Sequence, residues 1–281
     1  MTDSPSSRWA VVLGMSSGTG AAVARRLARD PGLSLFGMHR GHHPEGALSV
    51  LASVRSLGLR AEELVADAGC AEGAALGADE LLRLAGPRSV KVYVHAIANA
   101  SLGLLGGSPE ARVSPRQVQK TFESMCHSFV YWTQCLLDRD LLAPEALLLA
   151  LGNPLVDSLV RNGGLINATK AALEQYVRHL AFELGPLGHR VNLLKFGAVL
   201  TPAVEQTFEG AGVGRMREVL EQAIPAGRLS TVDEVAAFVS VLCAPEGRWF
   251  NGATIDFTGA QAQSLFDALL YPPRTPPHGR R

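Results

Sequence analysis

The sequence predicts one α/β domain, a doubly wound parallel sheet of seven strands with helices on both faces. Short apolar runs of strand length alternate with longer segments of helical spacing, which is the pattern of β-α-β units and of a sheet covered on both sides. The chain has 281 residues, of which 47% are hydrophobic, so it can fill one large core. No internal repeat interrupts the alternation.

The expected elements follow one another along the whole chain. Strands are expected at 9–13, 33–38, 60–65, 90–96, 146–151, 189–194 and 254–257. Helical spacing is clearest over 21–29, 118–138, 164–184 and 232–242. We expect residues 9–271 to form the domain, with flexible tails at 1–8, which is polar, and at 272–281, which is rich in proline and arginine.

A segment from about 200 to 226 interrupts the alternation near its end. It contains several glycines and two short helical patterns between the sixth strand and the last clear helix. Ligands of open α/β sheets bind beyond the carboxyl ends of the strands. We therefore expect this insertion to cover the substrate.

Charge and cysteine content disfavour several classes of partner. Acidic and basic residues balance at 26 each, so no net field draws the chain to nucleic acid or an anionic membrane, and a small-molecule partner is expected. No segment has the length of a membrane span or the form of a signal peptide, so we expect a cytoplasmic protein. The four cysteines form no CxxC pair, which favours reduced thiols and no metal site.

A glycine-rich turn follows the first expected strand and leads directly into a helix. Glycines permit a tight turn and let the backbone approach a pyrophosphate, while the helix N-terminus offers free amides to the anion. Between a strand and a helix, such a turn indicates the dinucleotide-binding Rossmann fold. A structural turn without a ligand is the alternative. The residues expected to hold the phosphates are Gly14, Ser16, Ser17, Gly18 and Gly20.

The residue that distinguishes NAD(H) from NADP(H) lies about 20 positions further on, at the end of the second strand. Counting from Gly20 reaches Arg40, next to His39, and no carboxylate occurs between Asp30 and Glu45. Arginine accommodates a 2′-phosphate, whereas Asp or Glu would bind a 2′-hydroxyl. The sequence therefore favours NADP(H), with His39 and Arg40 beside its adenosine; an ordinary solvated arginine is the alternative.

Further motifs occur in order along the chain. They are the spacing Gly14-x-x-x-Gly18-x-Gly20, HAIANA at 95–100, ATKAAL at 168–173, RVN at 190–192, PAGR at 225–228 and DEVA at 233–236. Together they resemble the short-chain dehydrogenase/reductase family over about 9–259. The segments 95–100 and 128–130 look more like its enoyl-acyl-carrier-protein reductase branch, whereas Phe196 replaces a usual proline. The resemblance implies cofactor contacts by Asp67, Ala96, Ile97, Lys170, Gly197, Val199 and Thr201.

The resemblance also implies a tyrosine acid, and the expected positions lack it. The family protonates the reduced carbonyl oxygen from a Tyr four residues before the Lys, or seven before it in the enoyl-reductase branch, and the Lys lowers the pKa of the phenol. Those positions hold Ile166 and Gly163. The catalytic candidates are then Lys170, Asn153, which can orient a substrate oxygen, and Asp157, a loop carboxylate that is otherwise merely solvated.

Three functions remain open at this point. The first is an NADPH-dependent reductase of an enoyl, keto or related apolar intermediate, including thioesters, that works without the tyrosine. The second is a repurposed fold that catalyses a cyclisation, dehydration or rearrangement, and the third is an inactive cofactor sensor or partner subunit. The family resemblance also implies a homotetramer or homodimer packed through 118–138 and 164–184.

Overall fold

The computed structural model describes residues 8–157, 159–201, 204, 212–264, 268 and 270, without the side chain of residue 155. The expected tails lie outside this range apart from residue 8, as does most of 202–211 in the expected insertion. The described residues form a parallel sheet in the order β3-β2-β1-β4-β5-β6-β7. The predicted doubly wound α/β fold with seven parallel strands is therefore confirmed.

The strands and helices alternate along the chain. The strands are β1 (Trp9–Leu13), β2 (Ser34–His39), β3 (Ala61–Val65), β4 (Val90–His95), β5 (Leu142–Gly152), β6 (Arg190–Phe196) and β7 (Thr254–Phe257). The helices are α1 (Gly18–Arg29), α2 (Pro44–Arg55), α3 (Ala71–Ala85), α4 (Pro115–Phe122), α5 (Ser128–Asp138), α6 (Gly164–Leu184), α8 (Val213–Ala223) and α9 (Val232–Cys243). Short helical turns are η1 (Glu123–His127), η2 (Pro154–Asp157), η3 (Gly185–Leu187) and η4 (Pro245–Gly247).

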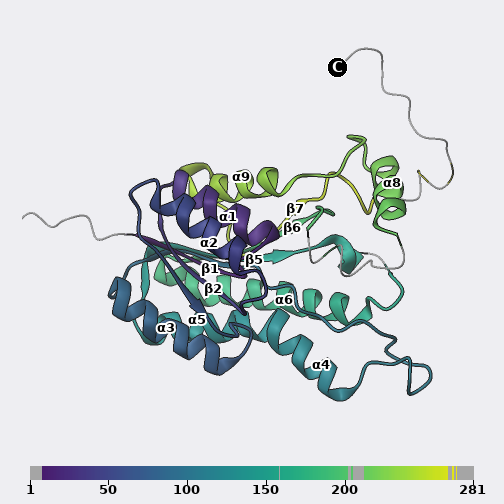
Figure 1. Ribbon diagram of the computed structural model, residues 1–281, viewed down its shortest axis with the longest axis horizontal. Coiled ribbons are helices and arrows are strands. Elements are labelled where there is room, and N and C mark those ends of the chain that lie inside the picture. Colours follow the sequence, from purple (N-terminus) through teal and green to yellow (C-terminus); the bar gives the residue numbers. More distant parts are fainter. Residues whose placement is uncertain are drawn as a thin grey trace, which may run out of the picture.

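Two layers of helices cover the sheet (Figure 1). Helices α1, α2 and α9 pack together on one face, and α3, α5 and α6 cover the other. Each face has its own apolar cluster, because side chains of successive strand residues point to opposite faces. The burial of every residue of β1 and β2 is the consequence of this double cover.

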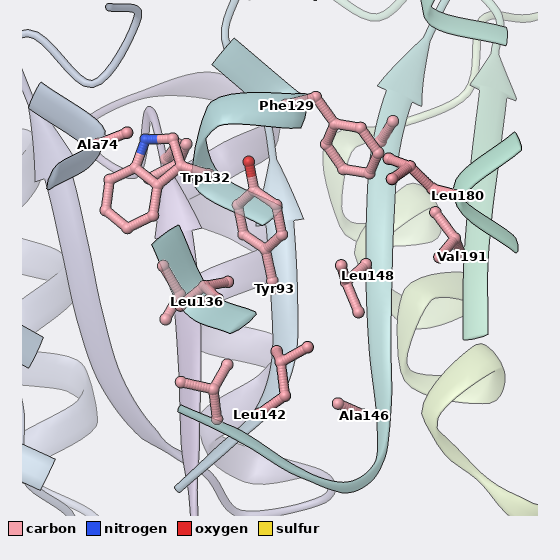
Figure 2. Close-up of a cluster of buried hydrophobic side chains, with 14 of the residues drawn as sticks. Ala74, Tyr93, Phe129, Trp132, Leu136, Leu142, Ala146, Leu148, Leu180 and Val191 are labelled. Carbon is pink, nitrogen blue, oxygen red and sulfur yellow. The ribbon is translucent and has the colours of Figure 1, made fainter. Parts of the chain in front are cut away.

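The core between the sheet and α5 is built from large aromatic side chains (Figure 2). Tyr93 of β4 stacks on Phe129 and on Trp132 of α5, with ring centroids 5.5 and 6.1 Å apart. The indole Nε1 of Trp132 donates a hydrogen bond to the carbonyl of Ala68 at 3.0 Å. This core therefore ties the segment after β3 to a helix that comes much later in the chain.

The structure corrects two element boundaries. The segment 118–138, expected as one helix, consists of α4, the π-helical turn η1 and α5. A π-helical turn adds one residue to a helix, and that residue has the same polarity as its surroundings. The spacing of apolar residues along the sequence therefore cannot reveal it. Strand β5 begins at Leu142 instead of residue 146, and its register with β4 shifts between Val90 and Val92.

Candidate nucleotide-binding and active site

The candidate site lies at the carboxyl edge of the sheet, where the strand order reverses. β1 pairs with β2 on one side and with β4 on the other, and the connections from these strands run to opposite faces. The loops that follow β1 and β4 therefore separate and leave a crevice between them. All of the predicted cofactor contacts lie in loops or helix starts at this edge, or at the end of a strand that reaches it.

The glycine turn after β1 is packed backbone to backbone. Gly14 has φ +80°, and a Cβ on it would lie 2.6 Å from the carbonyl oxygen of Ala96. A Cβ on Gly20 would lie 2.2 Å from the carbonyl oxygen of Gly14. Neither position has room for a side chain, so the turn brings its backbone amides close to the crevice, as a bound pyrophosphate requires.

Helix α1 begins inside this turn with its amides available to an anion. Ser17 caps it without a side-chain hydrogen bond, and the first turn contains no acidic residue. The first turn of a helix leaves backbone amides without partners in the helix, and its dipole favours negative charge. A cleft of about 670 Å³ opens beside the turn, lined by Ser16, Ser17 and Gly18 and by residues 42–46 of the α2 start. The geometry fits a dinucleotide phosphate.

The loop after β6 closes against the same turn. A Cβ on Gly18 would lie 3.2 Å from the side chain of Thr201, which is buried together with Val199. The backbone amide of Ala198 donates to the side-chain oxygen of Gln261 at 2.8 Å, which ties this loop to the segment after β7. Gly197 lies at the same contact, where a Cβ would lie 2.8 Å from that oxygen.

The structure corrects the role expected for His39. Its Nδ1 accepts a hydrogen bond from the amide of Gly41 at 3.1 Å, so Nε2 carries the proton and donates to Glu63 at 2.8 Å. Both ring nitrogens are thus used within the protein, and the ring is buried. His39 therefore holds the loop at the end of β2, and the next residue, Arg40, is exposed.

The other residues predicted to contact adenosine and nicotinamide lie in two further loops, after β3 and after β4. Asp67 follows β3, is exposed, and uses one carboxylate oxygen to accept from the amide of Gly69 at 2.9 Å. Ala96 and Ile97 follow β4 directly and are half-buried, and the amide of Ala96 donates to the carbonyl of Leu13 at 3.1 Å. Both loops therefore begin at the same edge of the sheet as the glycine turn.

Lys170 lies in the second turn of α6 and reaches the end of β5. Its side chain is buried, with a residue exposure of 5%, and Nζ donates to the carbonyl oxygen of Leu151 at 2.8 Å. Burial lowers the pKa of this ammonium to about 8. The alternative of a surface lysine is therefore wrong, and Lys170 holds a charge at the edge of the sheet.

His95 lies beside Lys170 at the end of β4. The hydroxyl of Ser128 gives its single proton to the carbonyl of Ser124 at 2.8 Å, so it accepts the 2.8 Å bond from Nε2 of His95. Nδ1 then carries the lone pair. It is buried without a hydrogen-bond partner among the described residues. Burial and the charge of Lys170 lower the pKa of His95 to about 3, so the ring is neutral.

No phenol reaches this edge in the described part of the chain. Tyr93 is buried in the aromatic core, whereas Tyr131 and Tyr176 line a groove of about 610 Å³ between α5 and α6. The hydroxyl of Tyr176 is hydrogen-bonded to Nδ1 of His127 at 3.1 Å. The fourth tyrosine, Tyr271, lies outside the described residues.

The catalytic candidate Asp157 is paired with a lysine that the sequence had not singled out. Its carboxylate lies 2.5 Å from Nζ of Lys195 at the end of β6, and Asp256 of β7 lies 3.7 Å from the same nitrogen. Burial opposes the charge of Lys195, but the hydrogen bond and the two carboxylates outweigh it and raise the pKa of Lys195. Asp157 thus anchors η2, which follows the half-buried Asn153, to the sheet.

Exposed apolar side chains gather on two segments that touch one another. They come from the loop after β4 and from the turn before α6, and we call them the apolar rim: Leu102, Leu104, Leu105, Leu159 and Val160. All are at least 38% exposed, and Leu159 is 99% exposed. The two segments touch, since the amide of Gly103 donates to the carbonyl of Asn162 at 3.2 Å and a Cβ on Gly164 would lie 2.9 Å from Leu105. This rim favours an apolar ligand.

Among the described helices, none combines the length and the hydrophobicity that a membrane span requires. Within the described residues, no group of three or more His, Cys, Asp or Glu side chains is placed to hold a metal ion.

Comparisons with known proteins agree with this geometry. The family model described as enoyl-(acyl carrier protein) reductase matches residues 14–259. The chain is 25% identical over 271 residues to 1-cyclohexenylcarbonyl-CoA reductase of Streptomyces collinus, a match that covers 94% of this chain and 92% of that protein. A shorter match to dehydrogenase OXI1 of Cochliobolus heterostrophus has 35% identity over 99 residues and covers 35% of this chain and 43% of that protein.

A solved structure resembles the whole described fold. It is a short-chain dehydrogenase from Burkholderia cenocepacia in complex with NADP, 25% identical in sequence, with a TM-score of 0.78. The similarity covers 91% of this chain and 98% of that one. The family model, the full-length relative and the shared fold agree, and the chain belongs to the short-chain dehydrogenase/reductase family of oxidoreductases.

Proposed function

We propose that the protein is an NADPH-dependent reductase of an apolar enoyl or keto substrate and that it works without a tyrosine acid. The observation that carries the proposal is the glycine turn, whose backbone is packed between Ala96 and Thr201 with the start of α1 open to phosphate. The similar Burkholderia structure contains NADP, and the full-length Streptomyces relative is named as a reductase of a CoA thioester. Both support a nicotinamide-dependent reduction.

The chain supplies binding and orientation around the cofactor. When bound, NADPH supplies a hydride to the substrate. The amides at the start of α1 hold its phosphates, and the buried Lys170 ammonium donates to its ribose. Asn153 orients the substrate oxygen, because an amide can donate a hydrogen bond to it, and the apolar rim excludes water.

Two further features belong to this proposal. The insertion at 200–226 covers the substrate from the side of Thr201. Helix α8 is the helix described within this insertion. A second copy of the chain covers the groove between α5 and α6, where Tyr131, Leu180 and Leu184 present apolar surface. The protein is accordingly proposed to act as a homodimer or homotetramer.

The direct test of the proposed function is NADPH consumption. Purified protein is mixed with NADPH and a panel of enoyl thioesters, ketones and quinones, and the loss of the reduced nicotinamide absorbance is followed. We expect turnover with an enoyl thioester or a ketone that carries a hydrophobic tail. Tight NADPH binding without turnover on any substrate would instead favour a non-redox reaction on the repurposed fold, and no NADPH binding would exclude both.

The exposed Arg40 is expected to set the preference for NADPH. Arg40→Ala should weaken NADPH binding by about 10- to 100-fold, since a charge-assisted bond to the 2′-phosphate is lost, and should change NADH affinity by less than about twofold. Titration calorimetry with both dinucleotides measures the difference. Arg29→Ala, which removes an exposed arginine at the far end of α1, is the control and should leave both affinities unchanged. Equal losses for the two dinucleotides in Arg40→Ala would refute the contact.

A further inference from the structure

The reacting edge needs a proton donor, and its described polar groups narrow the choice. The carboxylate of Asp157 is held by Lys195, and the amide of Asn153 is not a usable acid. The hydroxyl of Thr201 lies against Gly18 at the phosphate turn and accepts from the amide of Val204 at 3.3 Å. Two described lysines reach this edge: the ammonium of Lys195 is paired with Asp157 and Asp256, whereas the ammonium of Lys170 donates to the backbone carbonyl of Leu151. We therefore consider Lys170 as the acid.

The geometry places Lys170 between two strand ends. In the β4–β5 register His95 is paired with Ala150, one residue before the Leu151 carbonyl that accepts from Lys170. His95, like Tyr93 two residues earlier, points to the face of the sheet that α5 and α6 cover. The hydrogen bonds through Ser128 fix the ring and leave Nδ1 without a partner among the described residues. The ring is near enough to Lys170 for the ammonium charge to lower the pKa of His95.

We propose that the Lys170 ammonium, held by the Leu151 carbonyl and close to the unpartnered Nδ1 of His95, is the proton donor of the reduction. The proposal rests on the proposed function. The substrate carbon receives a hydride from NADPH, and the electron pair of the reduced double bond moves to the conjugated or carbonyl oxygen. One N–H bond of Lys170 breaks and its proton goes to that oxygen or to the adjacent carbon. NADP⁺ and a neutral lysine remain, and the lysine recovers a proton from water after product release.

The groups that face Lys170 permit this role. From β4 it faces the neutral His95, and from η1 the thiol of Cys126, whose pKa burial raises to about 12. From η2 the neighbouring carboxylate, Asp157, is held by Lys195 of β6. His95 and Cys126 therefore do not change charge near neutral pH, whereas burial places the pKa of Lys170 at about 8, the range in which an acid is most useful.

The first test replaces the lysine. Lys170→Arg keeps the charge and the donors but not a labile proton, so kcat should fall about 100-fold or more while the NADPH dissociation constant stays within about threefold. Lys170→Met removes the charge as well as the labile proton, so it should lose both the rate and the affinity for NADPH. The control is Lys91→Arg, because Lys91 also donates to a backbone carbonyl, that of Pro144 at 2.7 Å, but lies at the opposite end of β4. Its activity should equal that of the wild type.

The second test uses pH. A protonated donor is present at low pH and lost as pH rises, so kcat/KM should fall through a midpoint near 8. The same midpoint should appear without any substrate, in the NMR titration of the cofactor-free protein labelled with ¹³C at lysine Cε, where the Lys170 signal is assigned by its loss in Lys170→Arg. The absence of this alkaline loss in the active enzyme would overturn the proposal.

His95 is a positioning residue, and two variants separate its two nitrogens. In His95→Gln the amide nitrogen replaces Nε2 toward Ser128, and the acceptor at the Nδ1 position is lost. In His95→Asn the amide oxygen replaces Nδ1 and the bond to Ser128 is lost. An acceptor stabilises the charged lysine. His95→Gln should therefore lower the midpoint of kcat/KM and the midpoint of the NMR titration by about one pH unit, while His95→Asn should keep both. Equal midpoints in the wild type and in both variants would exclude His95 from the role.

The outcomes distinguish this proposal from the proposed function. If the wild type turns over and Lys170→Arg retains its rate, the lysine is not the donor and the reductase function stands. If the wild type binds NADPH but reduces nothing, both proposals fail together.

Discussion

Gly20→Ala is expected to remove dinucleotide binding. The new Cβ would lie 2.2 Å from the carbonyl oxygen of Gly14, a backbone atom that cannot rotate away, and Gly14 is itself packed on the carbonyl of Ala96. The turn can accept the methyl group only if α1 moves away from β1 and β4, and the amides then leave the phosphates. We expect the NADPH dissociation constant to rise at least about 100-fold and stability to fall by about 1–3 kcal/mol, as for an overpacked core.

The matched control for this substitution is Gly214→Ala. Gly214 lies within α8, no atom lies within 4 Å of its ideal Cβ, and alanine favours a helix over glycine by about 0.5–1 kcal/mol. It should bind NADPH like the wild type and unfold at an equal or higher urea concentration. Wild-type affinity in Gly20→Ala, measured by calorimetry, would show that the phosphates are held elsewhere.

Trp132→Ala is expected to cause the largest loss of stability. The indole is fully buried and stacks on Tyr93 (Figure 2). A Cβ on Gly77 of α3 would lie 2.4 Å from its ring. The neighbouring backbone already touches the ring and cannot collapse into the space that it leaves. Truncation should therefore cost about 3–5 kcal/mol, as measured by urea unfolding.

Trp132→Phe separates the packing of the ring from its hydrogen bond. Phenylalanine keeps an aromatic ring against Tyr93 but leaves the carbonyl of the buried Ala68 without its donor, which should cost about 1–3 kcal/mol. Both variants should unfold in one cooperative transition. Unfolding of Trp132→Ala at the wild-type urea concentration would contradict the central position of this side chain in the core.

The order of the elements could be predicted because each one is encoded locally. Helix α6 occupies Gly164–Leu184, as its apolar spacing predicts, since one face of it packs on the sheet along its full length. The π-helical turn η1 could not be predicted, because an added residue in a helix alters only the register between α4 and α5. The early start of β5 was also missed, because its first residues pair with β4 through a register shift.

The site could be predicted where the backbone itself forms it. The tight turn itself is visible in the sequence, since Gly14 and Gly20 stand where a Cβ would meet a backbone carbonyl oxygen and Gly18 adopts φ +54°. The use of His39 could not be predicted in the same way. Its partner Glu63 comes from the next strand, and only the β2–β3 register brings the two side chains together.

The pairs that involve Lys170 and Lys195 depend on tertiary structure even more strongly. A histidine at the end of the apolar strand β4 was a visible signal for His95, but its bond to Ser128 and its place beside Lys170 arise from helices far along the chain. Lys195 at the end of β6 resembles a solvated cation in the sequence. Its burial against Asp157 and Asp256 depends on how the loops after β5 and β6 pack against the sheet.

Under the proposed function, the apolar rim has a consequence for selectivity along a homologous series. Leu105 and Val160 belong to loops that touch one another, so a flexible tail that enters the site exchanges water for hydrocarbon over its length. Each methylene buried in this way contributes about 0.8 kcal/mol, or roughly a fourfold gain in affinity. Discrimination between short and long acyl tails then needs no dedicated hydrogen bond. It follows from the number of tail carbon atoms that the leucines remove from water.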